Sequence, residues 1–116
     1  MSELAFKSAT ELAAMIRAKE ISAVELLEHY LDRVERYNPD LNAIIVLDVE
    51  RARVRAREAD AALAKGEVWG SLHGVPMTIK ESYNVAGLPT TNGRPEMKDN
   101  IAKSDALAVE RLKDAG

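Results

Sequence analysis

One lysine of this 116-residue chain is a candidate for chemistry because it ends an apolar run. Lys80 directly follows the run from Val75 to Ile79, which is entered through Gly74. We expect this run to be a buried strand, and open α/β sheets place their ligand sites at the carboxyl ends of such strands. A lysine serves as a base near neutral pH only when its pKa falls from about 10.4 toward ~7 to 8, which burial can achieve. The position leaves two interpretations open: a desolvated base, or a solvated or ion-paired lysine.

The neighbours of Lys80 bear on that choice. Glu81 would favour the charged lysine if the two paired, and so would oppose a base role. Adjacent side chains of an extended strand face opposite sides, so we expect the Glu81 carboxylate to point away. A phosphate-binding loop of the form G-x-x-x-x-G-K-[ST] is excluded, because Ile79 replaces its second glycine and Glu81 replaces its hydroxyl residue.

The remaining polar groups give weaker signals. His29 and His73 are the two histidines, and neither belongs to a His-x-x-x-His or His-Glu pattern, so we expect structural or solvent roles and no metal site. Four arginines occupy alternate positions from Arg51 to Arg57. On a helix this spacing turns successive side chains by about 200°, which favours a solvated, ion-paired surface over a phosphate-binding patch.

Composition favours one globular domain without nucleic-acid or membrane partners. The chain is 47% apolar and 30% charged, and its net charge of -3 gives no general attraction to phosphates or anionic lipid. It contains no cysteine, which excludes disulfides and thiolate chemistry. Its start lacks the pattern of a signal peptide, and its longest aliphatic run, 43–47, is far too short to cross a bilayer. We therefore expect a cytoplasmic protein.

Helices are expected to form most of the scaffold around Lys80. Capping boxes of the form S-x-x-E begin at Ser8 and Ser22 and predict two helix starts. The expected helices cover about 9–19, 23–37, 48–65 and 105–113, the second ending before Pro39 and the third at Gly66. Strands are expected at 41–47 and 75–79, and a long ordered loop at 87–93. These elements predict an α/β fold class.

Several blocks of the sequence together resemble the amidase signature family. They are 8–12 and 21–26 in the opening helices, 74–80 around Lys80, 85–93 in the ordered loop, and 104–116 in the last helix. The resemblance covers essentially the whole chain and implies the helix-rich amino-terminal part of a large mixed-sheet fold, truncated. Residues 1–116 would then be one segment of a single domain. Within it we expect a helical scaffold with one strand at 1–69, the lysine strand and loop at 70–93, and a connector with a helix at 94–116.

The resemblance also implies a mechanism. The family cleaves carboxamides with a serine nucleophile, a second serine held in a cis peptide, and a lysine that Lys80 matches. Unprotonated Lys80 would draw a proton through the bridging serine from the nucleophile, which attacks the amide carbonyl. The implied substrate is a small-molecule amide, and no metal or organic cofactor is implied. The family often shows Lys-Asp-Asn where this chain has Lys80-Glu81-Ser82.

The serines of this chain do not stand in the family's glycine- and serine-rich segment; they occupy positions 2, 8, 22, 71, 82 and 104. We therefore expect amide hydrolysis from the complete protein and none from these residues alone. A glutaminase-like subunit of a tRNA-dependent amidotransferase is the alternative within the family. A noncatalytic fragment or association module is the alternative outside it, and exposed sheet edges would favour self-association.

Overall fold

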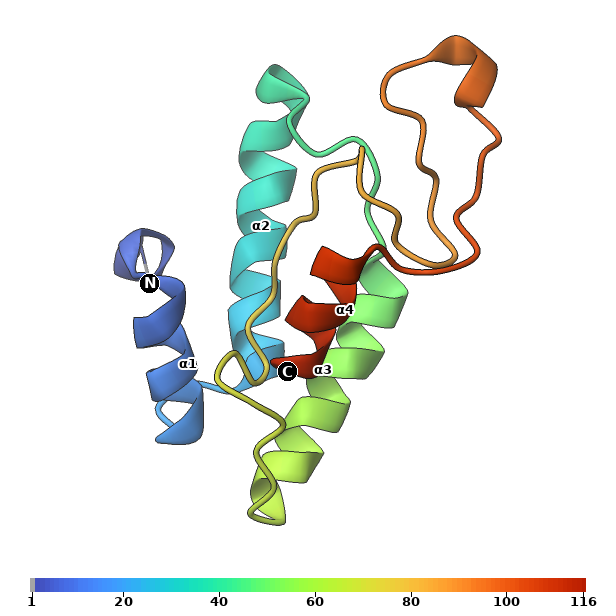
Figure 1. The fold of residues 1–116 in the computed structure, drawn as a ribbon. Helices are drawn as coiled ribbons and strands as arrows, with labels where there is room; N and C mark the ends of the chain where they lie inside the picture. The colour runs from blue at the N-terminus through green and yellow to red at the C-terminus, as the bar shows by residue number, and fades with distance from the viewer. Residues whose placement is uncertain (1) are drawn as a thin grey trace. The chain divides into compact units, whose positions relative to one another are not determined.

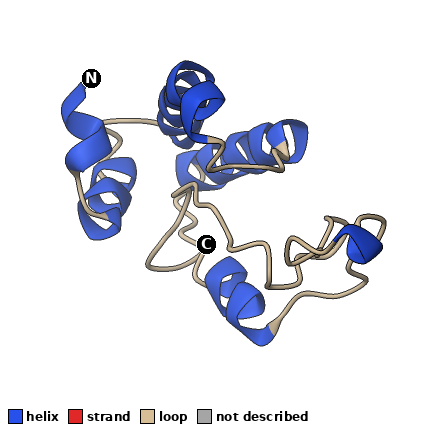
Figure 2. Ribbon diagram, turned by 90° about the horizontal axis from the view of Figure 1, so that it is seen from above, coloured by secondary structure: helices blue, strands red, loops and turns tan. Residues whose placement is uncertain are grey.

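The computed structural model describes residues 2–116, and every regular element within that range is a helix (Figures 1 and 2). The elements in chain order are η1 (Ser2–Phe6), α1 (Ala9–Arg17), α2 (Ala23–Leu41), α3 (Val49–Ala64), η2 (Pro95–Met97) and α4 (Leu107–Asp114). The chain divides into two compact units. The first holds the described residues up to Pro76 together with Ala115–Gly116, and the second is Met77–Asp114.

The first unit starts with the two predicted capping boxes, and both are confirmed. The backbone N–H of Glu11 donates to Ser8 Oγ at 3.2 Å, while Ser8 N–H donates back to the Glu11 carboxylate at 2.7 Å. Ser22 and Glu25 repeat the pattern at 3.0 and 2.9 Å. These bonds satisfy N–H groups that a helix start leaves without partners, which explains why α1 and α2 begin where they do.

The predicted end of the second helix was wrong, because α2 continues through Pro39 to Leu41. Two local features close the end of the helix after Pro39. Asn42 adopts a left-handed conformation at φ 48° and donates its backbone N–H to the Asn38 carbonyl at 2.7 Å. The Asn38 side chain then bonds both the N–H and the carbonyl of Ile44, each at 2.9 Å. A proline near the last turn removes only one internal bond, and the asparagines close the helix end around it.

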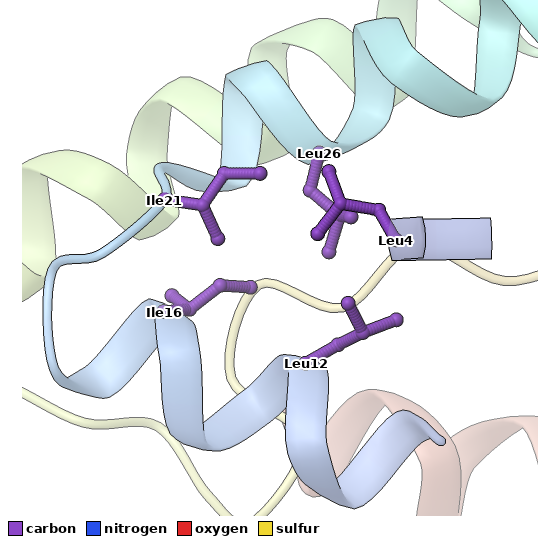
Figure 3. Close-up of a cluster of buried hydrophobic side chains, with 5 residues drawn as sticks. All are labelled: Leu4, Leu12, Ile16, Ile21 and Leu26. Carbon is purple, nitrogen blue, oxygen red and sulfur yellow. The ribbon is translucent and has the colours of Figure 1, made fainter. Parts of the chain in front are cut away.

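Two apolar clusters hold the first unit together. The first cluster joins η1, α1, the α1–α2 connection and α2, and its side chains point toward one another (Figure 3). They are Leu4, Leu12, Ile16, Ile21 and Leu26. The second cluster joins α2 to α3 through Ala23, Leu27, Ala56 and Ala59. Its alanines allow the helix backbones to approach closely, which suits a chain with only 4% aromatic residues.

The predicted strands at 41–47 and 75–79 are absent from the described residues, so these residues do not form the mixed sheet that we expected. Both segments run without regular structure, apart from the last α2 residue at 41. Ile45 and Leu47 are 59% and 51% exposed. A strand needs a neighbouring backbone to complete its hydrogen bonds, and no other segment within 2–116 supplies one to either run. The apolar, β-branched composition of these runs therefore indicates an extended backbone, but it does not by itself establish a sheet.

The second unit is mostly an ordered loop closed by α4. Gly87 N–H donates to the Ala102 carbonyl at 2.8 Å, and Ala102 N–H donates to the Leu88 carbonyl at 3.0 Å. Thr90 N–H donates to the Asn100 carbonyl at 2.9 Å, and one isolated antiparallel bridge joins Pro89 to Ile101. This pairing returns the chain toward α4 and confirms that 87–93 is an ordered loop.

Candidate functional site

Lys80 ends the extended segment that begins at Val75, and a tight turn follows it. The Lys80 carbonyl accepts the backbone N–H of Tyr83 at 2.9 Å. The side chain of Lys80 is exposed, and Met77 is 46% exposed. The described residues therefore do not bury this run as we expected. Within the described range, no acidic side chain pairs with the Lys80 ammonium group. The lysine is therefore presented at a chain turn without a bound counter-charge.

The Glu81 carboxylate is bonded to the 91–92 segment and not to Lys80. Its Oε1 accepts the backbone N–H of Thr91 at 2.7 Å and the Thr91 hydroxyl at 2.6 Å. Its Oε2 accepts the backbone N–H of Asn92 at 2.7 Å. The Thr91 hydroxyl and, more weakly, the two N–H groups hold the pKa of the Glu81 carboxyl below its ordinary value, against the smaller opposing effect of desolvation. Hydrogen bonds to the charged form thus keep Glu81 ionised in this loop.

The 90–93 loop has the backbone shape that a carboxylate needs. Asn92 and Gly93 have φ values of 51° and 69°, in the left-handed region. Successive N–H groups at such a turn form a concave anion-binding site, and here Glu81 occupies it. The Thr91 carbonyl accepts Arg94 N–H at 2.9 Å, which closes the turn. The sequence identified an ordered loop at 87–93 but not this role of Thr91 and Asn92, for which the only signal was the Asn92-Gly93 pair.

The two histidines have no site of their own. His73 is fully buried; its Nδ1 accepts the Trp69 backbone N–H at 3.0 Å, so its Nε2, 2.9 Å from the Ala59 carbonyl, is the nitrogen that donates. His29 lies edge-on to Tyr30 with ring centroids 5.4 Å apart. Across residues 2–116 there is no group of three or more His, Asp or Glu side chains that could hold a metal. Of the structural or solvent roles expected for the histidines, His73 has the structural one.

The serines whose side chains are described do not reach Lys80. Ser8 and Ser22 cap helices, and the Ser71 carbonyl accepts a bond from Arg17 at 3.3 Å. Ser82 lies two residues from Lys80 and is exposed. No serine hydroxyl from 8 to 104 bonds the lysine. The described residues thus contain an exposed lysine and a neighbouring glutamate held by hydrogen bonds, but no serine hydroxyl hydrogen-bonded to Lys80.

The arginines of α3 are engaged locally. Arg53 Nε lies 2.7 Å from Glu28 Oε1, which joins α3 to α2, and Arg51 lies 3.3 Å from Asp48. Arg55 lies over the Trp69 ring, 3.8 Å from its centroid. These contacts confirm the ion-paired surface expected for this helix.

No helix in the described part of the chain is long and apolar enough to cross a membrane.

Comparison with known proteins gives consistent matches. The family model described as Amidase matches residues 25–116. An indoleacetamide hydrolase of Bradyrhizobium diazoefficiens is 50% identical over 109 residues, which cover 94% of this chain and 21% of the relative. A glutamyl-tRNA(Gln) amidotransferase subunit of Acidothermus cellulolyticus is 41% identical over 116 residues, which cover 100% of this chain and 23% of the relative.

A solved structure of a fatty acid amide hydrolase matches with a TM-score of 0.91 and 30% sequence identity. The match covers 98% of this chain and 20% of that one. The chain thus spans about a fifth to a quarter of the length of the proteins that it matches.

Proposed function

The chain belongs to the amidase family, and we propose that the whole protein hydrolyses carboxamides with Lys80 as the base. The observation that carries this proposal is the family match over 25–116, which includes the block 74–80 that ends in Lys80. The 50% identity to an indoleacetamide hydrolase supports an amide substrate of small size. Glu81, the acidic residue next to Lys80 in the sequence, is bonded to Thr91 and Asn92 and not to the lysine.

The proposed reaction needs two serines besides Lys80, one as nucleophile and one as bridge. Neutral Lys80 would take the proton of the bridging hydroxyl while that hydroxyl takes the proton of the nucleophile. The nucleophile oxygen then bonds the carbonyl carbon, the C–N bond breaks, and the leaving nitrogen receives the proton. Water releases the acid by the same steps. Since no described serine bonds Lys80, we propose that both serines come from parts of the protein outside these residues.

Two features of the whole protein follow from this role. A lysine base must be shielded from water to be neutral near pH 7, so we propose that other parts of the protein cover the exposed Lys80 side chain. The extended segments 43–47 and 75–79 have backbone groups without sheet partners within 2–116. We propose that they join a mixed sheet in the whole protein.

A second candidate is the glutaminase-like subunit of a tRNA-dependent amidotransferase. The observation that favours it is the 41% identity, over the full 116 residues, to the glutamyl-tRNA(Gln) amidotransferase subunit of Acidothermus cellulolyticus. The chemistry at Lys80 would be the same, with glutamine as the amide. Turnover of glutamine that depends on added partner subunits would select this candidate over a free-standing hydrolase.

The test is ammonia release by the purified whole protein from indoleacetamide, other primary carboxamides and glutamine. We expect cleavage of at least one amide, and a loss of about 10³-fold or more in kcat/KM for Lys80→Ala, because the variant has no base. Lys98→Ala is the matched control, since Lys98 is an exposed lysine of the same unit. Unchanged turnover by a folded Lys80→Ala protein would remove the lysine from the mechanism. Absence of cleavage of every amide, with and without partner subunits, would favour a noncatalytic association module.

A further inference from the structure

We propose that Glu81 is a positioning residue for Lys80, which anchors the 91–92 backbone beside the lysine and is itself held away from the lysine amine. The inference deepens the proposed function and rests on it. The three hydrogen bonds between Glu81 and the loop carry it. Residues 80, 81, 91 and 92 all belong to the second unit.

The first step is that both carboxylate oxygens are occupied. Oε1 receives two donors from Thr91, at 2.6 and 2.7 Å, and Oε2 receives the Asn92 N–H at 2.7 Å. All three donors are neutral, and no other ionisable side chain in the described part of the chain is bonded to Glu81. The bonds therefore stabilise the charged carboxylate without supplying a cation, and the lowered pKa of Glu81 agrees with that.

The second step concerns what this carboxylate would do if released. It is attached to the residue that directly follows Lys80. An opposite charge within 4–6 Å of a lysine raises the lysine pKa by about 1 to 3 units, which would keep the amine protonated and unable to accept a proton. The bonds to Thr91 and Asn92 thus keep the Glu81 carboxylate from raising the pKa of Lys80.

The third step is that the loop is itself anchored. Thr90 exchanges two bonds with Asn100: its N–H donates to the Asn100 carbonyl at 2.9 Å, and its carbonyl accepts the Asn100 side-chain amide at 2.8 Å. Glu81 therefore connects the Lys80 turn to a segment that is already paired. A displacement of about 1 Å at a catalytic group can cost about 10²-fold in rate, so this connection has a kinetic consequence.

The experiment measures the pH dependence of kcat/KM for the whole protein on its best amide substrate. Thr91→Val removes the hydroxyl donor and keeps the side-chain shape, so it loosens the hold on Glu81. We expect the acid limb of the profile to move to higher pH by about half a unit or more, because the freed carboxylate approaches Lys80. The double variant Thr91→Val/Glu81→Gln has no charge to release, and its acid limb is expected at the wild-type pH or below it.

Three further variants separate positioning from simple stability. Thr90→Val is the matched control, since the Thr90 hydroxyl is buried with no hydrogen-bond partner in the described range, and it is expected to keep the wild-type profile. Glu81→Gln keeps one acceptor but loses the other, and is expected to lower kcat by about 10-fold or more with a smaller change in KM. Glu81→Asp retains both acceptors and should recover part of that loss.

An unmoved acid limb in Thr91→Val, or a shift that persists in the double variant, would overturn the inference. Loss of activity in proportion to the loss of folded protein, with an unchanged profile, would overturn it as well. Lys80→Ala distinguishes the two levels. If that variant is active, the proposed function fails; if it is inactive while the Thr91 and Glu81 variants match Thr90→Val, only the role of Glu81 fails.

Discussion

Lys80 and Glu81 are adjacent in the chain, yet their side chains have different surroundings. Lys80 is exposed at a turn, whereas Glu81 is bonded to Thr91 and Asn92 ten and eleven residues away. Strand alternation alone predicted that the two would diverge. The sequence predicted an ordered loop at 87–93, but not that its N–H groups would bind Glu81, because that depends on the left-handed conformations of Asn92 and Gly93 in the folded loop.

The role of His73, a buried residue, was also only partly predictable from the sequence. The absence of a metal pattern predicted a structural role, but nothing in the sequence indicated that His73 would be fully buried and bonded to both Trp69 and Ala59. Gly74, the next residue, has φ 75°, and an added Cβ there would lie 2.9 Å from the Ala23 Cβ. Tertiary packing on α2 and α3, rather than local pattern, decides the conformation of this turn.

Replacing His73 by alanine should destabilise the whole protein. The change opens a cavity and leaves the Trp69 N–H and the Ala59 carbonyl without their partner, for a cost of about 2–4 kcal/mol. The free energy of unfolding from denaturant titration measures this. His29→Ala, at a half-buried histidine, is the control and should cost less. Equal costs for the two variants would contradict the role of His73.

At the scale of elements, α2 receives an unexpected cap from α3. The backbone N–H groups of Ala23 and Val24 donate to the two Asp60 carboxylate oxygens at 2.7 and 3.1 Å, while Ser22 accepts from Glu25. One carboxylate thus satisfies the first two N–H groups of α2 and links the two helices. The capping box was readable from local spacing; Asp60 lies 37 residues from Ala23, so its contribution was not.

Asp60→Ala should lower the free energy of unfolding by about 1–3 kcal/mol, because two partly buried donors lose their acceptor. Asp60→Asn keeps one acceptor and should cost less. Asp32→Ala, at an exposed position of α2, is expected to change stability by no more than about 0.5 kcal/mol. Denaturant titration of the three variants measures the order, and an Asp60→Ala protein as stable as Asp32→Ala would show that the cap is not needed.

Helices were predicted better than strands for a physical reason. A helix satisfies its hydrogen bonds within its own segment, so the capping boxes place the starts of α1 and α2, and local pattern places α3 although Asp48 makes no side-chain cap bond. A strand depends on a partner, and the runs 41–47 and 75–79 have none within 2–116. Pro39 misled the prediction because the rule against proline applies to helix interiors, whereas here Asn38 and Asn42 bond around the last turn.

At the scale of the molecule, each unit is stabilised by its own contacts. In the first unit, Ala115 and Gly116 return to the 70–74 turn: their carbonyls accept the N–H groups of Leu72 at 2.8 Å and Gly74 at 3.1 Å. A Cβ at Gly70 would lie 2.4 Å from the Ala115 carbonyl oxygen, so this position requires glycine. Gly70 and Gly74 thus both lie where the chain packs too closely to admit a side chain.

The 116-residue chain produced by itself should self-associate. Ile45, Val46 and Leu47 are 59%, 38% and 51% exposed, and this extended run offers unpaired backbone groups to another chain. Light scattering after size exclusion measures the mass, and the double variant Ile45→Glu/Val46→Lys is expected to reduce association. A monomeric mass with a sharp cooperative melt would contradict this expectation.

The proposal that Lys80 is the base of an amidase is tested most directly by the pH dependence of kcat/KM in the wild-type whole protein and in Lys80→Ala. A base accepts a proton only when it is itself unprotonated, so the wild-type rate should rise with pH through an acid limb. In Lys80→Ala the residual rate, reduced by about 10³-fold or more, should lack that limb. A folded Lys80→Ala protein that retains the wild-type limb would contradict the assignment of Lys80.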